Sequence, residues 1–114
     1  MYITETKKFK NFKYVFRKPA NFKADEKHPV IIFLHGAGTR GTDIERLINN
    51  SFFTETGKYK NDAVVFAPQC FADTWFDVFE QLWEFIQYAV NHEFCDKTRV
   101  YMMGASMGGL PAIR

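Results

Sequence analysis

Three short apolar runs divide the chain. They are Val30–Leu34, Ala63–Ala67 and Val100–Met103, and each is flanked by proline, glycine or polar residues. A continuous apolar run of this length is typical of a strand buried on both faces, which occurs mainly in parallel sheets. Segments with helical spacing lie between the runs. This alternation of strands and helices predicts an α/β fold with right-handed crossover connections.

Residues 2–18 follow a different pattern, because hydrophobic and polar positions alternate there. Such alternation predicts two short strands, with Lys10-Asn11 as the turn and Pro19 closing the unit. Residues 20–29 then form a polar loop. Aromatic residues share one face of the second strand and basic residues the other: Phe12, Tyr14 and Phe16 against Lys13 and Arg17.

The clearest helical pattern covers residues 75–92, where Asp73 or Thr74 can cap the start. Its apolar half contains Trp75, Val78, Phe79, Leu82, Trp83, Phe85, Ile86, Ala89 and Val90, and its polar half Asp77, Glu80, Gln81, Glu84, Gln87 and Tyr88. We expect the aromatic residues to belong to the core, with Trp75 as a candidate pocket wall. A shorter helix is expected after a capping box formed by Thr42 and Glu45.

Composition supports a single globular domain: 114 residues, 46% of them hydrophobic and 18% aromatic. Residues 1–28 carry a net charge of +5 within a total of +2. Basic and aromatic residues interleaved in this way occur in nucleic-acid-binding proteins, but lysines on the solvent face of a strand pair explain the pattern better. We therefore expect no nucleic-acid partner.

The two cysteines, Cys70 and Cys95, fit neither a disulfide framework nor a zinc site, and no metal or cofactor is expected. The sequence has no apolar signal core and no run long enough to cross a membrane. These features predict a soluble cytoplasmic protein with no membrane span.

The third apolar run leads into Gly104-Ala105-Ser106-Met107-Gly108, which fits the Gly-x-Ser-x-Gly signature of a nucleophile elbow. In such an elbow the serine lies on a tight strand-to-helix turn with its hydroxyl exposed. Glycine is needed at 104 and 108 because a side chain there would collide with neighbouring backbone. The motif is short, so its meaning depends on the rest of the chain.

The first apolar run leads into a second glycine-rich loop, Gly36–Gly41, and two interpretations of it compete. Gly-x-Gly-x-x-Gly between a strand and a helix is typical of dinucleotide binding, but the next strand ends in Ala67-Pro68-Gln69, without the acidic residue that would hold a ribose. Alternatively, His35-Gly36-Ala37-Gly38 is an oxyanion loop. The N–H groups of Ala37 and Met107 would then stabilise the charge formed when Ser106 attacks an ester.

Together these segments resemble the N-terminal half of an α/β-hydrolase, close to the carboxylesterase, phospholipase/carboxylesterase and prolyl-oligopeptidase-like branches. The matching segments span residues 30–110 in order: 33–38, 40–43, 67–70 with Trp75, 96–101 and 104–109. The resemblance implies a serine hydrolase of carboxylic esters, with Ser106 as nucleophile and with His35, Gly36 and Gly38 supporting the oxyanion loop.

The resemblance also implies a fold. We expect a mostly parallel sheet with helices on both faces and an N-terminal antiparallel strand pair. Residues 1–29 would form the N-terminal strands and loop, and residues 30–114 the core of the same domain. The strand ending at His35 should lie between the other two core strands, so that the Ala37 loop and Ser106 are adjacent.

One departure from the family pattern bears on activity. α/β-Hydrolases place the acid and the histidine of the triad after the nucleophile, whereas no Asp, Glu or His follows Ser106 here. None of His28, His35 and His92 is expected to be the base. We therefore expect a complementing C-terminal segment to supply both groups and the isolated chain to be weakly active or inactive. The alternative is a non-catalytic binding or assembly module.

Overall fold

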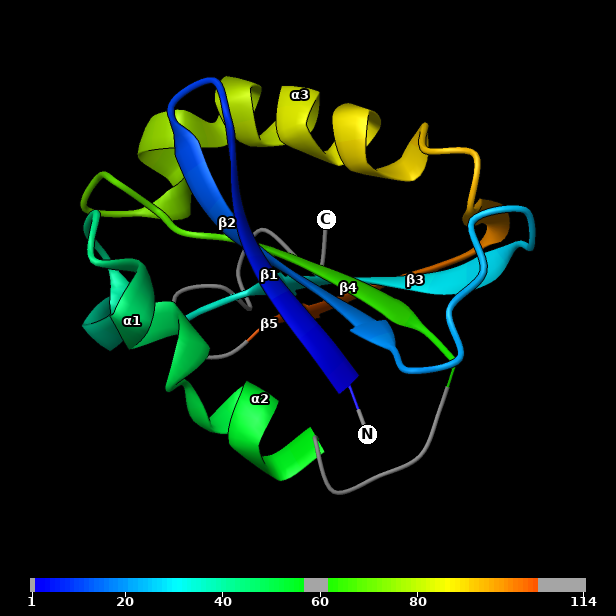
Figure 1. Ribbon diagram of the computed structural model, residues 1–114. Helices are drawn as coiled ribbons and strands as arrows, with labels where there is room; N and C mark the ends of the chain where they lie inside the picture. The colour runs from blue at the N-terminus through cyan, green and yellow to red at the C-terminus, as the bar shows by residue number, and fades with distance from the viewer. Residues whose placement is uncertain (1, 57–61, 105–114) are drawn as a thin grey trace.

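The computed structural model describes residues 2–56 and 62–104, which form one mixed sheet with helices on both sides (Figure 1). The five strands of this sheet lie in the order β1-β2-β4-β3-β5. Their bounds are β1 Tyr2–Phe9, β2 Phe12–Pro19, β3 His28–Leu34, β4 Val64–Pro68 and β5 Cys95–Gly104.

Among the described strands, β2 alone runs opposite to the other four. β1 and β2 form an antiparallel hairpin, and β2 is also antiparallel to β4. β4, β3 and β5 are parallel, with β3 in the middle. The hairpin turn places the backbone of Lys10 at φ 53°, a left-handed conformation that residues other than glycine or asparagine seldom adopt. The predicted fold class and the central position of β3 are confirmed.

The helices divide between the two faces of the sheet. Helix α3 (Phe79–Val90), preceded by the one-turn helix η2 (Trp75–Val78), covers one face. The short helices α1 (Ile44–Ile48) and α2 (Ser51–Thr56) cover the other, as Figure 1 shows. Helix α2 was not expected from the sequence, because six residues are too few for a clear helical period. None of the helices in the described ranges is long and apolar enough to span a membrane.

Alternate residues of each core strand pack on opposite faces. Val30, Ile32 and Leu34 join the cluster beneath α3, whereas Phe33 joins the smaller cluster beneath α1 and α2. Both clusters are inaccessible to water at their centres. The strands are therefore apolar on both faces, which explains why they occur as continuous runs in the sequence.

The second face of β2 differs from the expected basic, solvent-facing surface. Lys13 is exposed, but Arg17 is 3% exposed. Its guanidinium lies 4.3 Å from the ring centroid of Tyr2 and donates a hydrogen bond of 2.9 Å to the Thr56 hydroxyl. Helix α2, which the sequence pattern did not reveal, buries this side chain.

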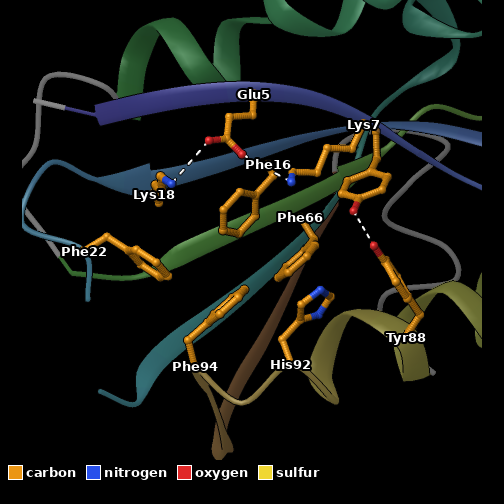
Figure 2. Close-up of a pocket in the computed structure, with 10 residues that line it drawn as sticks. Glu5, Lys7, Phe16, Lys18, Phe22, Phe66, Tyr88, His92 and Phe94 are labelled. Atoms are coloured by element: carbon orange, nitrogen blue, oxygen red, sulfur yellow. Dashed lines mark hydrogen bonds and ion pairs between the residues drawn. The ribbon is translucent and has the colours of Figure 1, made fainter. Parts of the chain in front are cut away.

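Helix α3 is rotated relative to its predicted apolar half. Tyr88, placed on the polar half, points toward the hairpin, and its hydroxyl lies 2.6 Å from that of Tyr14 (Figure 2). Trp83, placed on the apolar half, is 57% exposed. Both placements were wrong, because the hairpin packs against one side of α3 and draws Tyr88 inward.

The caps of the helices agree with the sequence in one case and differ in the other. Asp43, rather than Thr42, caps α1 by accepting the Glu45 N–H at 3.1 Å. Thr74 caps η2 as one of the two predicted candidates, in a capping box with Asp77.

We expect Thr74→Ala to lower the free energy of unfolding by about 1 kcal/mol, because the Asp77 N–H loses its side-chain acceptor. Denaturant unfolding followed by circular dichroism measures this change. Thr74→Ser retains the hydroxyl and should remain within about 0.5 kcal/mol of the parent. Equal losses in the two variants would contradict a role for the cap.

Candidate active site

The candidate site lies at the edge of the sheet where the parallel strands β3 and β5 end. Leu34, the last residue of β3, pairs with Gly104, the last residue of β5. The loop that starts at His35 therefore leaves the sheet beside Gly104. In open α/β sheets this carboxyl edge is where ligands bind.

Of the predicted site residues, the structure describes six: His35, Gly36, Ala37, Gly38, Trp75 and Gly104. Ser106, Met107 and Gly108 lie outside the described residues, so their roles stay predictions. Gly104 is the final residue of β5. Ala37 begins the one-turn helix η1 (Ala37–Thr39). The first N–H groups of such a turn have no acceptor within it.

His35 ties this loop to the segment that follows β4. Its Nε2 accepts the N–H of Cys70 at 2.8 Å, so Nδ1 carries the ring proton and donates it to the carbonyl of Gly36 at 2.6 Å. The side chain is completely buried. Burial lowers the pKa of His35, and the nearby charge of Arg40 adds a smaller effect in the same direction, against the opposing effect of the Gly36 hydrogen bond. Both nitrogens of this neutral imidazole are hydrogen-bonded to backbone groups. The ring therefore positions the backbone and has no free lone pair that could accept a proton.

Trp75 lies directly behind His35. The indole Nε1 donates a hydrogen bond of 3.0 Å to the His35 carbonyl, and the two ring centroids are 5.0 Å apart. Trp75 is fully buried among core residues that include Phe12. The structure thus places Trp75 in support of the loop that starts at His35; its role as a pocket wall stays a prediction.

Gln69 is a site residue that the sequence analysis did not single out. Its side-chain Nε2 donates to the carbonyls of Thr39 at 3.0 Å and of Asp43 at 2.7 Å, so one amide group spans the loop from η1 to the cap of α1. The side chain is 1% exposed. The available signal was a polar residue directly after a buried strand, at the same edge of the sheet as the two glycine loops.

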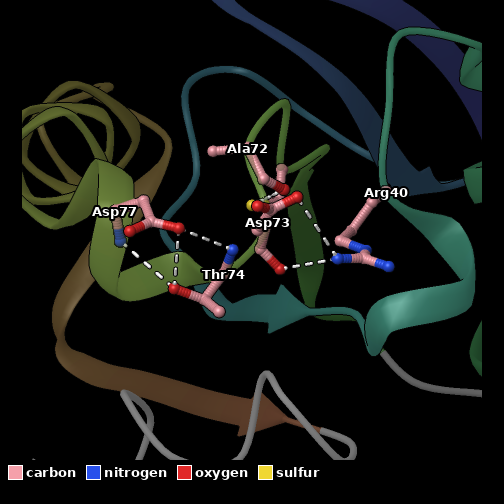
Figure 3. A network of polar contacts seen from close by, with 6 residues as sticks. Arg40, Ala72, Asp73, Thr74 and Asp77 are labelled. Atoms are coloured by element: carbon pink, nitrogen blue, oxygen red, sulfur yellow. Dashed lines mark hydrogen bonds and ion pairs between the residues drawn. The ribbon is translucent and has the colours of Figure 1, made fainter.

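Further contacts hold the far side of the loop. Arg40 donates to the Asp73 carbonyl at 2.9 Å (Figure 3). The Gly41 N–H donates to the Cys70 carbonyl at 2.9 Å. Gly41 has φ of +121°, a conformation that favours glycine. The loops after β3 and β4 therefore form one hydrogen-bonded unit.

The dinucleotide interpretation of the glycine-rich loop finds little support at this edge. The helix after the glycine loop, α1, has only five residues, unlike the long helix whose N-terminus receives a dinucleotide phosphate. Within residues 2–56 and 62–104, no three His, Cys, Asp or Glu side chains are grouped in a way that would hold a metal ion.

The sequence matches no protein-family model and no curated protein. Solved structures do resemble it. A thermostable esterase superposes with a TM-score of 0.64 at 24% identity, over 95% of this chain and 35% of that one. Esterase 2 of Thermogutta terrifontis, phosphoramylated by tabun, has a TM-score of 0.65 at 20% identity, over 96% and 45%. A ferulic acid esterase has a TM-score of 0.65 at 20% identity, over 98% and 52%.

These similarities establish the fold. The chain has a partial α/β-hydrolase fold, as the sequence predicts. It spans about one third to one half of the length of these esterases.

Proposed function

We propose that this chain is the N-terminal part of a serine hydrolase of carboxylic esters. The observation that carries the proposal is the pairing of Leu34 with Gly104, which makes the His35–Gly38 loop and the start of the Gly-x-Ser-x-Gly motif neighbours. Ser106 is two residues beyond Gly104, and two residues of polypeptide span at most about 7 Å. A nucleophile and an oxyanion loop this close meet the first requirement of acyl transfer.

In the proposed reaction the Ser106 hydroxyl attacks the ester carbonyl, and the N–H groups of Met107 and Ala37 receive the developing oxyanion. The C–O bond to the alcohol then breaks, and the alcohol leaves with the proton that Ser106 gave up. Water next hydrolyses the acyl-serine ester, which releases the carboxylic acid and restores the serine hydroxyl. The hydrogen bonds of His35 and Gln69 keep the loop in position beforehand, so that little reorganisation is needed during the reaction.

The base and its acid partner would come from a complementing C-terminal segment. β5 supports this part of the proposal, because apolar side chains are exposed on both of its faces: Tyr101 is 56% exposed, Met102 37% and Met103 43%. Neighbouring residues of a strand point to opposite faces. Among the described strands, β5 forms the free edge of the parallel part of the sheet. A further strand with covering helices would bury this surface and bring the missing triad groups.

The test is covalent labelling of the full-length protein with a fluorophosphonate. The chemistry is that of the neighbouring esterase 2 structures, which are modified by tabun, sarin or paraoxon. We expect mass spectrometry to locate one adduct on Ser106, and Ser106→Ala to abolish it. Ser51→Ala, which removes an exposed serine at the start of α2, serves as the matched control and should label like the parent. Absence of an adduct on Ser106 would favour the non-catalytic binding module.

A further inference from the structure

A pocket with a volume of about 170 Å³ lies on the α3 face of the sheet (Figure 2). It is away from the candidate active site, because Phe22 and Phe94 line it from the segments that lead into β3 and β5. Those segments adjoin the amino ends of the strands, whereas His35 and Gly104 lie at the carboxyl ends. The esterase proposed above does not use this pocket.

Aromatic rings form most of the pocket wall. The ring centroid of Phe16 lies 5.0 Å from that of Phe66 and 5.6 Å from that of Phe94, and His92 lies 5.0 Å from Phe94. Aromatic rings attract one another in tilted or offset arrangements at centroid distances of about 4.5–7 Å. An aromatic ligand can therefore make the same kind of contact with these side chains. An apolar cavity of about 150 Å³ is known to take up benzene. A pocket of this size and lining therefore accommodates one six-membered ring with a small substituent.

Paired tyrosine hydroxyls give the pocket a hydrogen-bond donor. The hydroxyl oxygens of Tyr14 and Tyr88 are 2.6 Å apart, and one of the two protons occupies the bond between them. Burial, followed by the hydrogen bond with Tyr88, raises the pKa of Tyr14, so the phenol keeps its proton at neutral pH. Within the described part of the chain, the pair makes no other hydrogen bond. One O–H group is therefore left to donate to a ligand.

The rim of the pocket carries an excess of positive charge. The Glu5 carboxylate forms ion pairs with the Lys18 ammonium at 3.2 Å and with the Lys7 ammonium at 3.4 Å. One negative charge therefore lies between two positive charges. The Lys18 side chain is only 23% exposed. An anion beside it is screened less than on an open surface.

We propose that this pocket binds a small aromatic carboxylate of the size of benzoate. The ring would lie among Phe16, Phe66 and Phe94. The carboxylate would accept a hydrogen bond from the Lys18 ammonium, which lies at the opposite end of the pocket from the tyrosine pair. An aliphatic acid would lack the contacts with the aromatic walls, and a neutral aromatic molecule would lack the ion pair with Lys18 at the rim.

Titration of the isotope-labelled full chain with sodium benzoate, followed by amide and aromatic NMR shifts, tests the proposal. We expect saturable shifts at the pocket residues, with a dissociation constant on the order of 1 mM, as suits a ligand with so few atoms. Benzyl alcohol, which has the ring without the charge, should bind at least about fivefold more weakly. Shifts elsewhere only, or equal binding of the two compounds, would overturn the proposal.

Three variants sharpen the test. Lys18→Met should weaken benzoate binding at least about fivefold, and Glu5→Gln should strengthen it by about twofold because the rim gains net positive charge. Lys8→Met, on the same hairpin but outside the pocket, makes the same charge change and should bind benzoate like the parent. An equal effect of Lys8→Met and Lys18→Met, or weaker binding by Glu5→Gln, would show that the pocket does not recognise the carboxylate.

Discussion

Replacing Trp75 with alanine should lower the free energy of unfolding by about 3–5 kcal/mol, one of the largest single effects available in this chain. The side chain is fully buried, so its removal leaves a cavity where the indole packs against Phe12 and His35. It also removes the donor to the His35 carbonyl. Denaturant unfolding of the full chain, followed by circular dichroism, measures the loss.

The other tryptophan supplies the matched control. Trp83 is 57% exposed on α3, and Trp83→Ala should change the free energy of unfolding by less than about 1 kcal/mol. Trp75→Phe, which keeps most of the ring but not the N–H, should fall between, because it leaves a buried carbonyl without its donor at a cost of about 1–3 kcal/mol. If Trp75→Ala and Trp83→Ala had similar effects, the packing around His35 would be other than described.

In the full-length esterase proposed above, replacing His35 with alanine should lower kcat for ester hydrolysis by about 100-fold, with little change in KM. His35 is a positioning residue: it connects the oxyanion loop to the N–H of Cys70. Small displacements of groups that stabilise a transition state cost rate on this scale. The oxyanion forms only during the reaction, so the loss should fall on kcat. Steady-state kinetics on a chromogenic ester measures both constants.

A variant of a second buried histidine, His28, distinguishes an effect on kcat from an effect on the free energy of unfolding. His28 begins β3, the strand that His35 follows, and its ring nitrogens contact the carbonyls of Asp62 and Lys23. His28→Ala should also destabilise the protein, but it should leave kcat within about twofold of the parent because it lies at the opposite end of the strand. A similar fall of kcat in both variants would mean that His35 acts through overall stability alone.

The strands of the core were predictable because their signal is local. Val30–Leu34 and Ala63–Ala67 are apolar at every position, and only a strand buried on both faces requires that pattern over so short a length. The hairpin was predictable for the related reason that alternation with period two marks a strand with unlike faces. The structure shifts the second run by one residue to Val64–Pro68, and it starts the third strand earlier than predicted, at Cys95. It confirms the order of the strands.

The helices were less predictable, since their packing depends on what covers them. A helical wheel assigned Tyr88 to solvent and Trp83 to the core, and the hairpin reverses both. Arg17 was expected to face solvent because α2 is too short to give a helical pattern in the sequence. In the structure, α2 covers the Arg17 side chain. In each case the deciding contact comes from a segment distant in the sequence.

The sequence by itself determined which residues are strands, where the two glycine-rich loops fall, and that both follow strands of a parallel sheet. Only the tertiary structure decided how the candidate site is held. Trp75, Gln69 and Cys70 had to meet His35 and its loop from more than 25 residues away. The physical reason is that strand periodicity is a property of neighbouring residues. Buried hydrogen bonds, by contrast, are satisfied by whichever donors and acceptors the packed chain brings together.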